Sequence, residues 1–366
     1  GGGLFAIFFS FTMENLQLLR EIKFFDCSSL GVKSPVTMRF GIYTSNGSVD
    51  SPFNMINFAT LCMDNAISSI NNTYSMFTDD FKEQIDIEIS TTSQMQPAIE
   101  NNEFVLFFQP QYDAVTKKLV GAETLCRWIR PDGTVISPKL FISIAEKNGM
   151  IRILDNYIWN LAFKTIRDWM NNGIEIVPIS INISRKNLES DGFIGIIHRL
   201  QKTYNIDTKY IHFEITESSN MNDKNNLIDR INKLKKLGYK VAMDDFGSGY
   251  SSLNSLKDIP IDILKLDMGF LDGNNNADKG GTIISNVIRM AQTLGLQIIA
   301  EGVETQNQAN MLRSLGCDIF QGYLYSKPIP EAEFLDLMKT SDKQIDFHDD
   351  DNAKKLKNHL IAKAIM

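Results

Sequence analysis

From residue 104 onward, short apolar runs alternate with longer amphipathic segments. This alternation is typical of repeated βα units around a parallel sheet, and it restricts the chain to the α/β folds. Strands are predicted over residues 105–109, 119–127, 176–183, 212–216, 240–243, 263–266, 297–300 and 318–320. Helices are predicted between them at residues 152–170, 226–237, 282–294 and 306–315. About eight strands favour a closed, TIM-like barrel over an open sheet.

The first two strands differ from the others in how they are joined. The apolar runs at 104–112 and 119–128 are separated only by the short polar turn 113–118. A link of this length cannot contain the crossover that parallel neighbours need. The barrel is therefore predicted to begin with an antiparallel hairpin.

Length and charge limit the function. With 366 residues, of which 43% are hydrophobic, the chain can bury a large core and also form a second, smaller unit. The net charge of −7 argues against binding of a DNA or RNA polymer, which requires clustered Lys and Arg. An anionic substrate would need metal ions to offset the acidic surroundings.

The cysteines and the apolar segments point to a protein of the cytoplasm. Cys27, Cys62, Cys126 and Cys317 are scattered, so they predict neither a zinc site nor a disulfide framework. The most apolar stretch, residues 4–11, is much shorter than the roughly 20 residues that cross a bilayer. Because no secretory signal precedes it and the chain opens on three glycines, we interpret the sequence as part of a longer protein. An upstream sensor or membrane-attached region is left open.

Polar residues end the predicted strands, where a βα barrel carries its active site. They are Glu123, Asn182, Glu214, Glu217, Asp244, Asp245, Lys265 and Glu301. A single carboxylate at a strand end is about as often a helix cap or a solvated loop residue as a ligand. Several carboxylates at one barrel mouth repel one another unless cations lie among them. The set therefore predicts bound divalent metal.

The donor types indicate which metal. Carboxylate and amide oxygens are hard ligands, and no histidine or cysteine occupies a ligand position, which favours Mg²⁺ or Mn²⁺. The adjacent acids Asp244 and Asp245 suit a two-metal centre of the kind that hydrolyses phosphodiesters. The glycine- and serine-rich segment 247–252 follows them and is expected to close over the site.

Taken in order, these motifs resemble the EAL-domain cyclic di-GMP phosphodiesterases over residues 101–338. The resemblance is carried by Phe108-Gln109-Pro110, Glu123-Thr124-Leu125 with Arg127, Asn182, Glu214 with Glu217, Asp244-Asp245-Phe246-Gly247, Lys265, Glu301-Gly302-Val303-Glu304 and Gln321-Gly322-Tyr323. So many ordered motifs make the resemblance specific. It implies an α/β fold: a modified TIM (β/α)8 barrel with an antiparallel first strand, preceded by a small N-terminal α/β segment.

The resemblance also assigns roles. It implies hydrolysis of cyclic di-GMP to linear pGpG with two Mg²⁺ or Mn²⁺ ions per active site. Glu123, Asn182, Glu214 and Asp244 would hold the first ion, and Asp244 with Asp245 the second. Lys265 would orient the attacking water, and Glu301 would act as base or as partner of the second ion. Glu217 and Glu304 would brace the loops, and Gln109, Arg127, Glu304, Gln321 and Tyr323 would form the substrate site.

Two features depart from the family pattern. Thr124 stands where the signature has alanine; because strand neighbours point to opposite faces, we expect it to face the helix layer and leave the ligand Glu123 untouched, with reduced activity at worst. The leading segment resembles the second half of a GGDEF domain, but Gly3 and Leu4 replace its acids. The predicted division is a degenerate GGDEF-like remnant at 1–85, a linker helix at 86–102, the barrel at 103–343 and an acidic, amphipathic tail at 344–366.

Two other functions compete with hydrolysis of cyclic di-GMP. One is a receptor that binds cyclic di-GMP without turnover, although such relatives usually lack metal ligands that this sequence has. The other is a metal-dependent barrel enzyme that stabilises an enolate with carboxylates and a lysine. The sequence leaves a homodimer and the regulatory input open.

Overall fold

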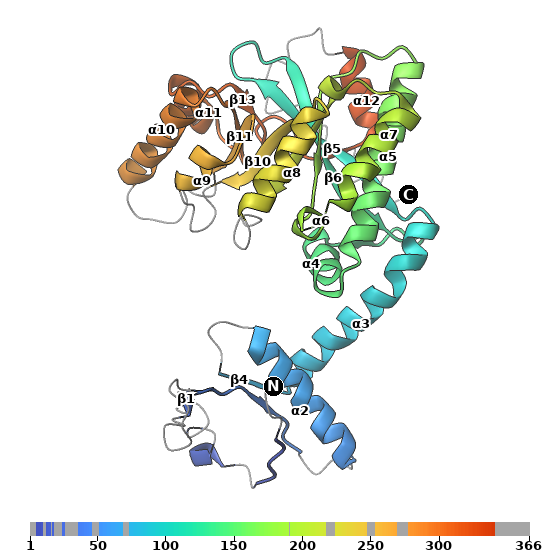
Figure 1. Cartoon of the computed structure of the whole chain (residues 1–366), viewed down its shortest axis with the longest axis vertical. Coiled ribbons are helices and arrows are strands. Elements are labelled where there is room, and N and C mark those ends of the chain that lie inside the picture. The colour runs from blue at the N-terminus through green and yellow to red at the C-terminus, as the bar shows by residue number, and fades with distance from the viewer. Residues whose placement is uncertain are drawn as a thin grey trace. The chain divides into compact units, whose positions relative to one another are not determined.

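A computed structural model describes residues 5–9, 12–15, 17, 24–25, 36–45, 51–68, 73–189, 191–216, 224–246, 253–268 and 277–340. The chain folds as two compact units, Gly1–Ser93 and Gln94–Met366 (Figure 1). Among the helices within the described residues, none is both long enough and apolar enough to cross a membrane.

The first unit contains a βαβ arrangement. Strand β3 (Phe40–Ile42) pairs in parallel with β4 (Tyr74–Met76), and helix α2 (Pro52–Ser68) connects them. Strands β1 (Phe24–Phe25) and β2 (Val36–Thr37) form a separate antiparallel pair. Strand β3 lies directly against α2, because a side chain at Gly41 would meet the carbonyl oxygen of Ala59 at 1.7 Å. This order agrees with a small N-terminal α/β segment.

Helix α3 (Asp79–Glu100) begins in the first unit and ends in the second. The predicted boundaries of a remnant ending at residue 85 and a linker helix ending at residue 102 stay predictions. Gly3, Leu4 and the tail at 344–366 lie outside the described residues.

The second unit is a closed barrel, as predicted. Its strands are β5 (Phe104–Asp113), β6 (Leu119–Ile129), β8 (Ile179–Asn182), β9 (Ile211–Thr216), β10 (Lys240–Phe246), β11 (Ile263–Asp267), β12 (Gln297–Glu301) and β13 (Ile319–Phe320). From β6 to β13, the neighbours in this series pair in parallel. Strand β5 closes the ring by pairing with both β6 and β13.

The antiparallel hairpin is confirmed. Strand β5 runs against β6, with Phe104 opposite Trp128 and Gln109 opposite Glu123. Because Trp128 is near the C-terminal end of β6, β5 begins on the side of the barrel where the parallel strands end. A βα unit that began with a parallel strand would enter from the other side.

Helices lie outside the ring of strands (Figure 1). They are α4 (Pro138–Asn148), α5 (Ile151–Asn171), α6 (Arg185–Leu188), α7 (Gly192–Tyr204), α8 (Lys224–Lys236), α9 (Leu253–Asp258), α10 (Ala277–Thr293), α11 (Gln306–Ser314) and α12 (Glu331–Thr340). Two short strands, β7 (Val135–Ile136) and β14 (Ile329–Pro330), and the 3₁₀ turn η2 (Thr208–Tyr210) complete the unit. Helix α11 starts at a capping box, in which Thr305 and Gln308 satisfy each other's backbone amides.

The barrel interior changes from apolar to polar within one strand period. Ala242, Ile263, Ile299 and Ile319 form one buried cluster on four neighbouring strands. Side chains two positions apart on a strand point to the same face. Two residues beyond the members of this cluster stand Asp244, Lys265, Glu301 and Gln321. The polar residues therefore line the C-terminal side of an apolar floor.

Candidate active site

Lys265 lies at the centre of the polar cluster. Its side chain is fully buried on β11, and its Nζ is 3.1 Å from Glu123, 2.6 Å from Glu214, 3.1 Å from Asp244 and 2.9 Å from Glu301. These four carboxylates come from four different strands, β6, β9, β10 and β12. The predicted convergence of acids at the barrel mouth is thus present in the structure.

Two amides extend the cluster around Glu123. Asn182, the last residue of β8, donates from Nδ2 to Glu123 Oε1 at 3.2 Å. Gln321 donates from Nε2 to Glu123 Oε2 at 2.7 Å. Gln321 is buried and also donates to Gln109, so it contacts both a predicted metal ligand and a predicted substrate residue.

The carboxylates form two groups with spacing suited to cations. In the first, ligand atoms of Glu123, Glu214 and Asp244 lie within 4.8 Å of one another, and in the second the same holds for Asp244, Asp245 and Glu301. Asp244 belongs to both, as a bridging ligand would. Glu214 Oε1 is buried and has no hydrogen-bond partner among the residues that the structure describes. An unsatisfied buried carboxylate oxygen is costly, and a hard cation would satisfy it. The residues present therefore fit a pair of divalent ions.

Burial and mutual repulsion perturb the acids. The pKa of Glu214 is raised to about 8, first by burial and then by Glu123 and Asp244, against the pull of Lys265. Burial likewise raises the pKa of Glu301 well above its usual range. Burial alone would raise the pKa of Asp244, but Lys265 and a hydrogen bond with Glu301 hold it below its ordinary value. Burial thus favours the protonated forms of Glu214 and Glu301, next to Asp244, which Lys265 keeps ionised.

The charge of Lys265 is secured by its neighbours. Burial disfavours the ammonium, but the surrounding carboxylates outweigh burial and raise the pKa of Lys265 well above its usual range. A lysine that stays cationic cannot serve as a general base. It is suited instead to holding a water or a phosphate oxygen.

Asp245 has an unusual backbone. Its φ is +56°, in the left-handed region that few residues other than glycine adopt, and its N–H donates to Asp244 Oδ1 at 3.0 Å. Such outliers concentrate at functional sites. Burial, followed by the charge of Asp244, raises the pKa of Asp245 to about 6.

The predicted substrate residues differ in exposure and in their contacts. Gln109 accepts a hydrogen bond from Gln321 at 3.3 Å, and Tyr323 has 58% of its surface exposed, with the Lys327 ammonium 5.3 Å from its ring. The Arg127 guanidinium lies 5.6 Å from the Phe107 ring. Glu304 is exposed. Glu217 and the segment 247–252 lie outside the described residues.

Sequence reasoning missed one buried amide in the site. Gln111 donates from Nε2 to Gln321 Oε1 at 2.8 Å and thereby fixes which end of the Gln321 amide faces Glu123. It occupies space left by Gly121 on β6, where a side chain would approach Gln111 Oε1 to 2.6 Å. The signal was available, because Gln111 follows Gln109 by two residues on one strand and so shares its face.

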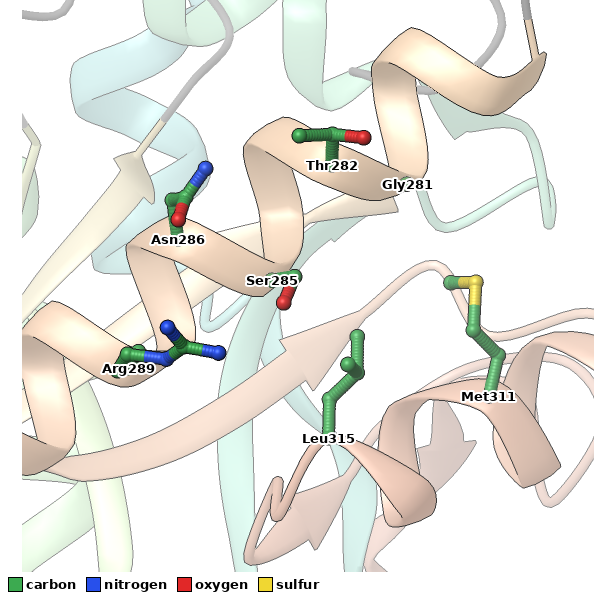
Figure 2. A pocket seen from close by; sticks show the side chains of 7 residues that line it. All are labelled: Gly281, Thr282, Ser285, Asn286, Arg289, Met311 and Leu315. Atoms are coloured by element: carbon green, nitrogen blue, oxygen red, sulfur yellow. The ribbon is translucent and has the colours of Figure 1, made fainter.

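A cavity of about 600 Å³ lies elsewhere, between α10 and α11. Figure 2 shows Ser285 and Arg289 of α10 facing Leu315 across it. None of the predicted site residues lines this cavity. The candidate site is therefore defined by the carboxylates and not by the volume of this hollow.

Fold and site together define a closed barrel of the TIM type with a cluster of carboxylates at the C-terminal ends of its strands. The chain belongs to the EAL domain family, whose family model matches residues 92–328.

Individual relatives agree with this assignment. The chain is 37% identical over 248 residues to the signaling protein YkoW of Bacillus subtilis, which covers 68% of the chain and 31% of YkoW. It is 31% identical over 271 residues to the cyclic di-GMP phosphodiesterase RocR of Pseudomonas aeruginosa, covering 74% of the chain and 69% of RocR. The chain thus spans about a third of the length of YkoW.

Solved structures share the fold. The PaMucR phosphodiesterase in complex with c-di-GMP superposes with a TM-score of 0.63 at 31% identity, covering 67% of this chain and 99% of that one. The EAL enzyme Bd1971, in its form with cAMP and cyclic di-GMP bound, gives a TM-score of 0.66 at 31% identity, covering 79% of this chain and 77% of that one.

Proposed function

We propose that this chain hydrolyses one phosphodiester bond of cyclic di-GMP and releases linear pGpG. The observation that carries the proposal is the pair of carboxylate groups that share Asp244 around Lys265. Similarity to RocR and to the PaMucR complex supports the identity of the substrate.

We propose that two divalent cations, Mg²⁺ or Mn²⁺, serve this reaction. Glu123, Asn182, Glu214 and Asp244 would hold the first, and Asp244 with Asp245 the second. When bound, such a pair lowers the pKa of water and neutralises charge at the attacking and leaving oxygens of a phosphodiester. The hard oxygen donors and the orphaned Glu214 Oε1 support this assignment.

The residues of the chain divide the remaining work. Lys265 stays cationic and holds the attacking water against phosphorus. Glu301 has its carboxylate 2.9 Å from Lys265 Nζ and lies on the second side of the cluster. In its ionised form, Glu301 would accept the proton of that water, and the ribose oxygen that leaves phosphorus would take up a proton as its P–O bond breaks. Gln109, Arg127, Gln321 and Tyr323 bind the dinucleotide, with the exposed Tyr323 ring offering a face to a guanine.

Incubation of the purified chain with cyclic di-GMP and Mn²⁺ or Mg²⁺, followed by chromatography, tests the proposal. We expect pGpG to appear with either metal and to be absent with EDTA. Binding of cyclic di-GMP without pGpG would favour the receptor function instead.

Several finer assignments are part of the proposal. We propose that residues 1–85 are a degenerate GGDEF-like remnant, that 86–102 link it to a barrel at 103–343, that 344–366 form a tail, and that the chain acts in the cytoplasm. The βαβ order of β3, α2 and β4 is compatible with the remnant. A homodimer and an upstream sensor region stay predictions from the sequence.

A further inference from the structure

One stripe of helix α5 contacts the connection between β8 and α6. Arg152, Asp155 and Trp159 are spaced i, i+3 and i+7, which places them on the same face of a helix. Trp159 Nε1 donates to the backbone carbonyl of Asn182 at 3.0 Å. Arg152 Nε donates to the carbonyl of Lys186 at 3.1 Å. The stripe therefore holds the chain at Asn182 and again four residues later.

Asp155 makes the central contact. Its Oδ2 accepts hydrogen bonds from the backbone N–H of Ser184 at 3.0 Å and from Asn187 Nδ2 at 2.7 Å. Ser184 precedes α6, so the carboxylate takes an amide at the start of that helix. Trp159 is fully buried, and Asn187 is buried as well. Both hydrogen bonds of Asp155 are partly buried, so their loss would leave polar groups with limited access to water.

The end of β8 needs this support because its strand pairing is short. Strand β8 has four residues and pairs with β6 only at Ile179 and Ser180. Beyond that point β9 holds it from one side, through the register of Asn182 with Glu214. On the other side, α5 supplies the contacts to the backbone at Asn182 and beyond.

We infer that Asp155 and Trp159 are positioning residues for Asn182. The inference rests on the proposed function, in which Asn182 is a ligand of the first cation. A neutral amide is a weak ligand, so its contribution depends on where its oxygen is held. Outer partners of metal ligands typically change metal affinity by about 10- to 100-fold when they are replaced.

The test uses two tryptophans of one helix. Trp159→Phe keeps an aromatic ring but removes the pyrrole half of the buried indole, together with the N–H that reaches Asn182. Trp169→Phe is the matched control: Trp169 is also buried on α5, but its N–H donates to Glu331 on α12, at 3.2 Å. Melting temperature, Mn²⁺ affinity from electron paramagnetic resonance of free Mn²⁺, and turnover of cyclic di-GMP are measured for both.

We expect both variants to lower the melting temperature by similar amounts, and only Trp159→Phe to weaken Mn²⁺ binding, by about 10-fold. At saturating Mn²⁺, its kcat should return to within roughly threefold of the parent, because the ligands themselves are unchanged. Equal Mn²⁺ affinity in Trp159→Phe and Trp169→Phe would overturn the inference.

Asp155 provides a second, independent pair. Asp155→Leu removes the acceptor and should weaken Mn²⁺ binding by about 10-fold, whereas Asp155→Asn keeps an oxygen that accepts both hydrogen bonds and should restore most of the affinity. Loss of affinity in neither variant would count against the inference. A parent chain that binds Mn²⁺ but does not hydrolyse cyclic di-GMP would contradict the proposed function alone, because the positioning of Asn182 is measured by Mn²⁺ binding.

Discussion

The ammonium of Lys265 lies 2.6 Å from Glu214 Oε2, and both side chains are fully buried. A buried ammonium needs compensating negative charge, and its removal would leave the ionised carboxylates around it, such as Asp244, uncompensated. Here the imbalance would be larger than usual, because three further carboxylates share the same lysine.

We therefore predict that Lys265→Met destabilises the metal-free protein by about 3–5 kcal/mol and cripples turnover. Urea denaturation in EDTA measures the first effect, and chromatography of pGpG the second. Lys235→Met is the control, since Lys235 forms a partly exposed pair with Asp262 at 2.7 Å and should cost about 1 kcal/mol or less. Similar losses in the two variants would show that the Lys265 cluster is not coupled as its geometry indicates.

Asp244 belongs to both carboxylate groups, whereas its neighbour Asp245 belongs to one, so their variants should differ. Asp244→Asn should weaken the binding of both cations and abolish turnover. Glu123→Ala should weaken the binding of the first cation and also abolish turnover. Circular dichroism should show that both variants stay folded. Asp245→Asn should lower the Mn²⁺ stoichiometry from two to one and reduce turnover by roughly 100-fold. Equilibrium dialysis with Mn²⁺ distinguishes these cases, and full activity in Asp244→Asn would remove the proposed metal centre.

Thr124 makes a contact that we did not predict from the sequence. Its hydroxyl is buried and donates to the carbonyl of Ser180 at 2.8 Å, which joins β6 to β8. Thr124→Ala should cost about 1 kcal/mol of stability and change turnover only modestly, whereas Thr124→Ser keeps the hydrogen bond. Thermal denaturation and initial rates measure both. A rise from no activity to strong activity in Thr124→Ala would mean that threonine blocks catalysis.

The raised pKa values predict a pH dependence of metal binding. The protons on Glu214, with its pKa near 8, and on Asp245, with its pKa near 6, must leave before a cation binds. Mn²⁺ affinity should therefore rise from pH 6 to pH 8, with protons released into weakly buffered solution. A Mn²⁺ affinity that does not vary with pH would contradict the shifts.

For the metal-free protein, the raised pKa of Glu214 has the opposite consequence: the free energy of unfolding falls as the pH rises. Because the folded pKa of Glu214 lies above its ordinary value of 4.5, the folded state binds more protons than the unfolded state between these two values. The extra stability is present at low pH and is lost as the pH rises through the folded pKa. In EDTA, Glu214 should lower the free energy of unfolding by about 1 kcal/mol per pH unit over this range, and Glu214→Gln should make the slope shallower by that amount.

The sequence predicted the parts of the molecule that follow local rules. Strand and helix periodicity, together with the length of the turn at 113–118, was sufficient for the barrel and its antiparallel start. The acids at strand ends were found because parallel strands bring their C-terminal ends to one rim. Lys265 was singled out for the same reason, although its contact with four carboxylates required coordinates.

The contacts of α5 could not be predicted in this way. Asp155 lies in a predicted amphipathic helix, where a single acid usually faces solvent. Its partners Ser184 and Asn187 are about thirty residues further along the chain and belong to a loop whose path no local pattern specifies. Tertiary packing alone brings these groups together.

Because the first strand is reversed, helix α3 leads into the barrel at the C-terminal end of β6. Strand β5 starts opposite Trp128, whose indole donates to Glu103 at 2.9 Å, and Gln94 of helix α3 accepts a hydrogen bond from Arg130. The chain thus joins the barrel on the rim that carries the acids. A twist or shift transmitted through the last turns of α3 would arrive directly at β6, the strand of Glu123, without crossing the apolar floor.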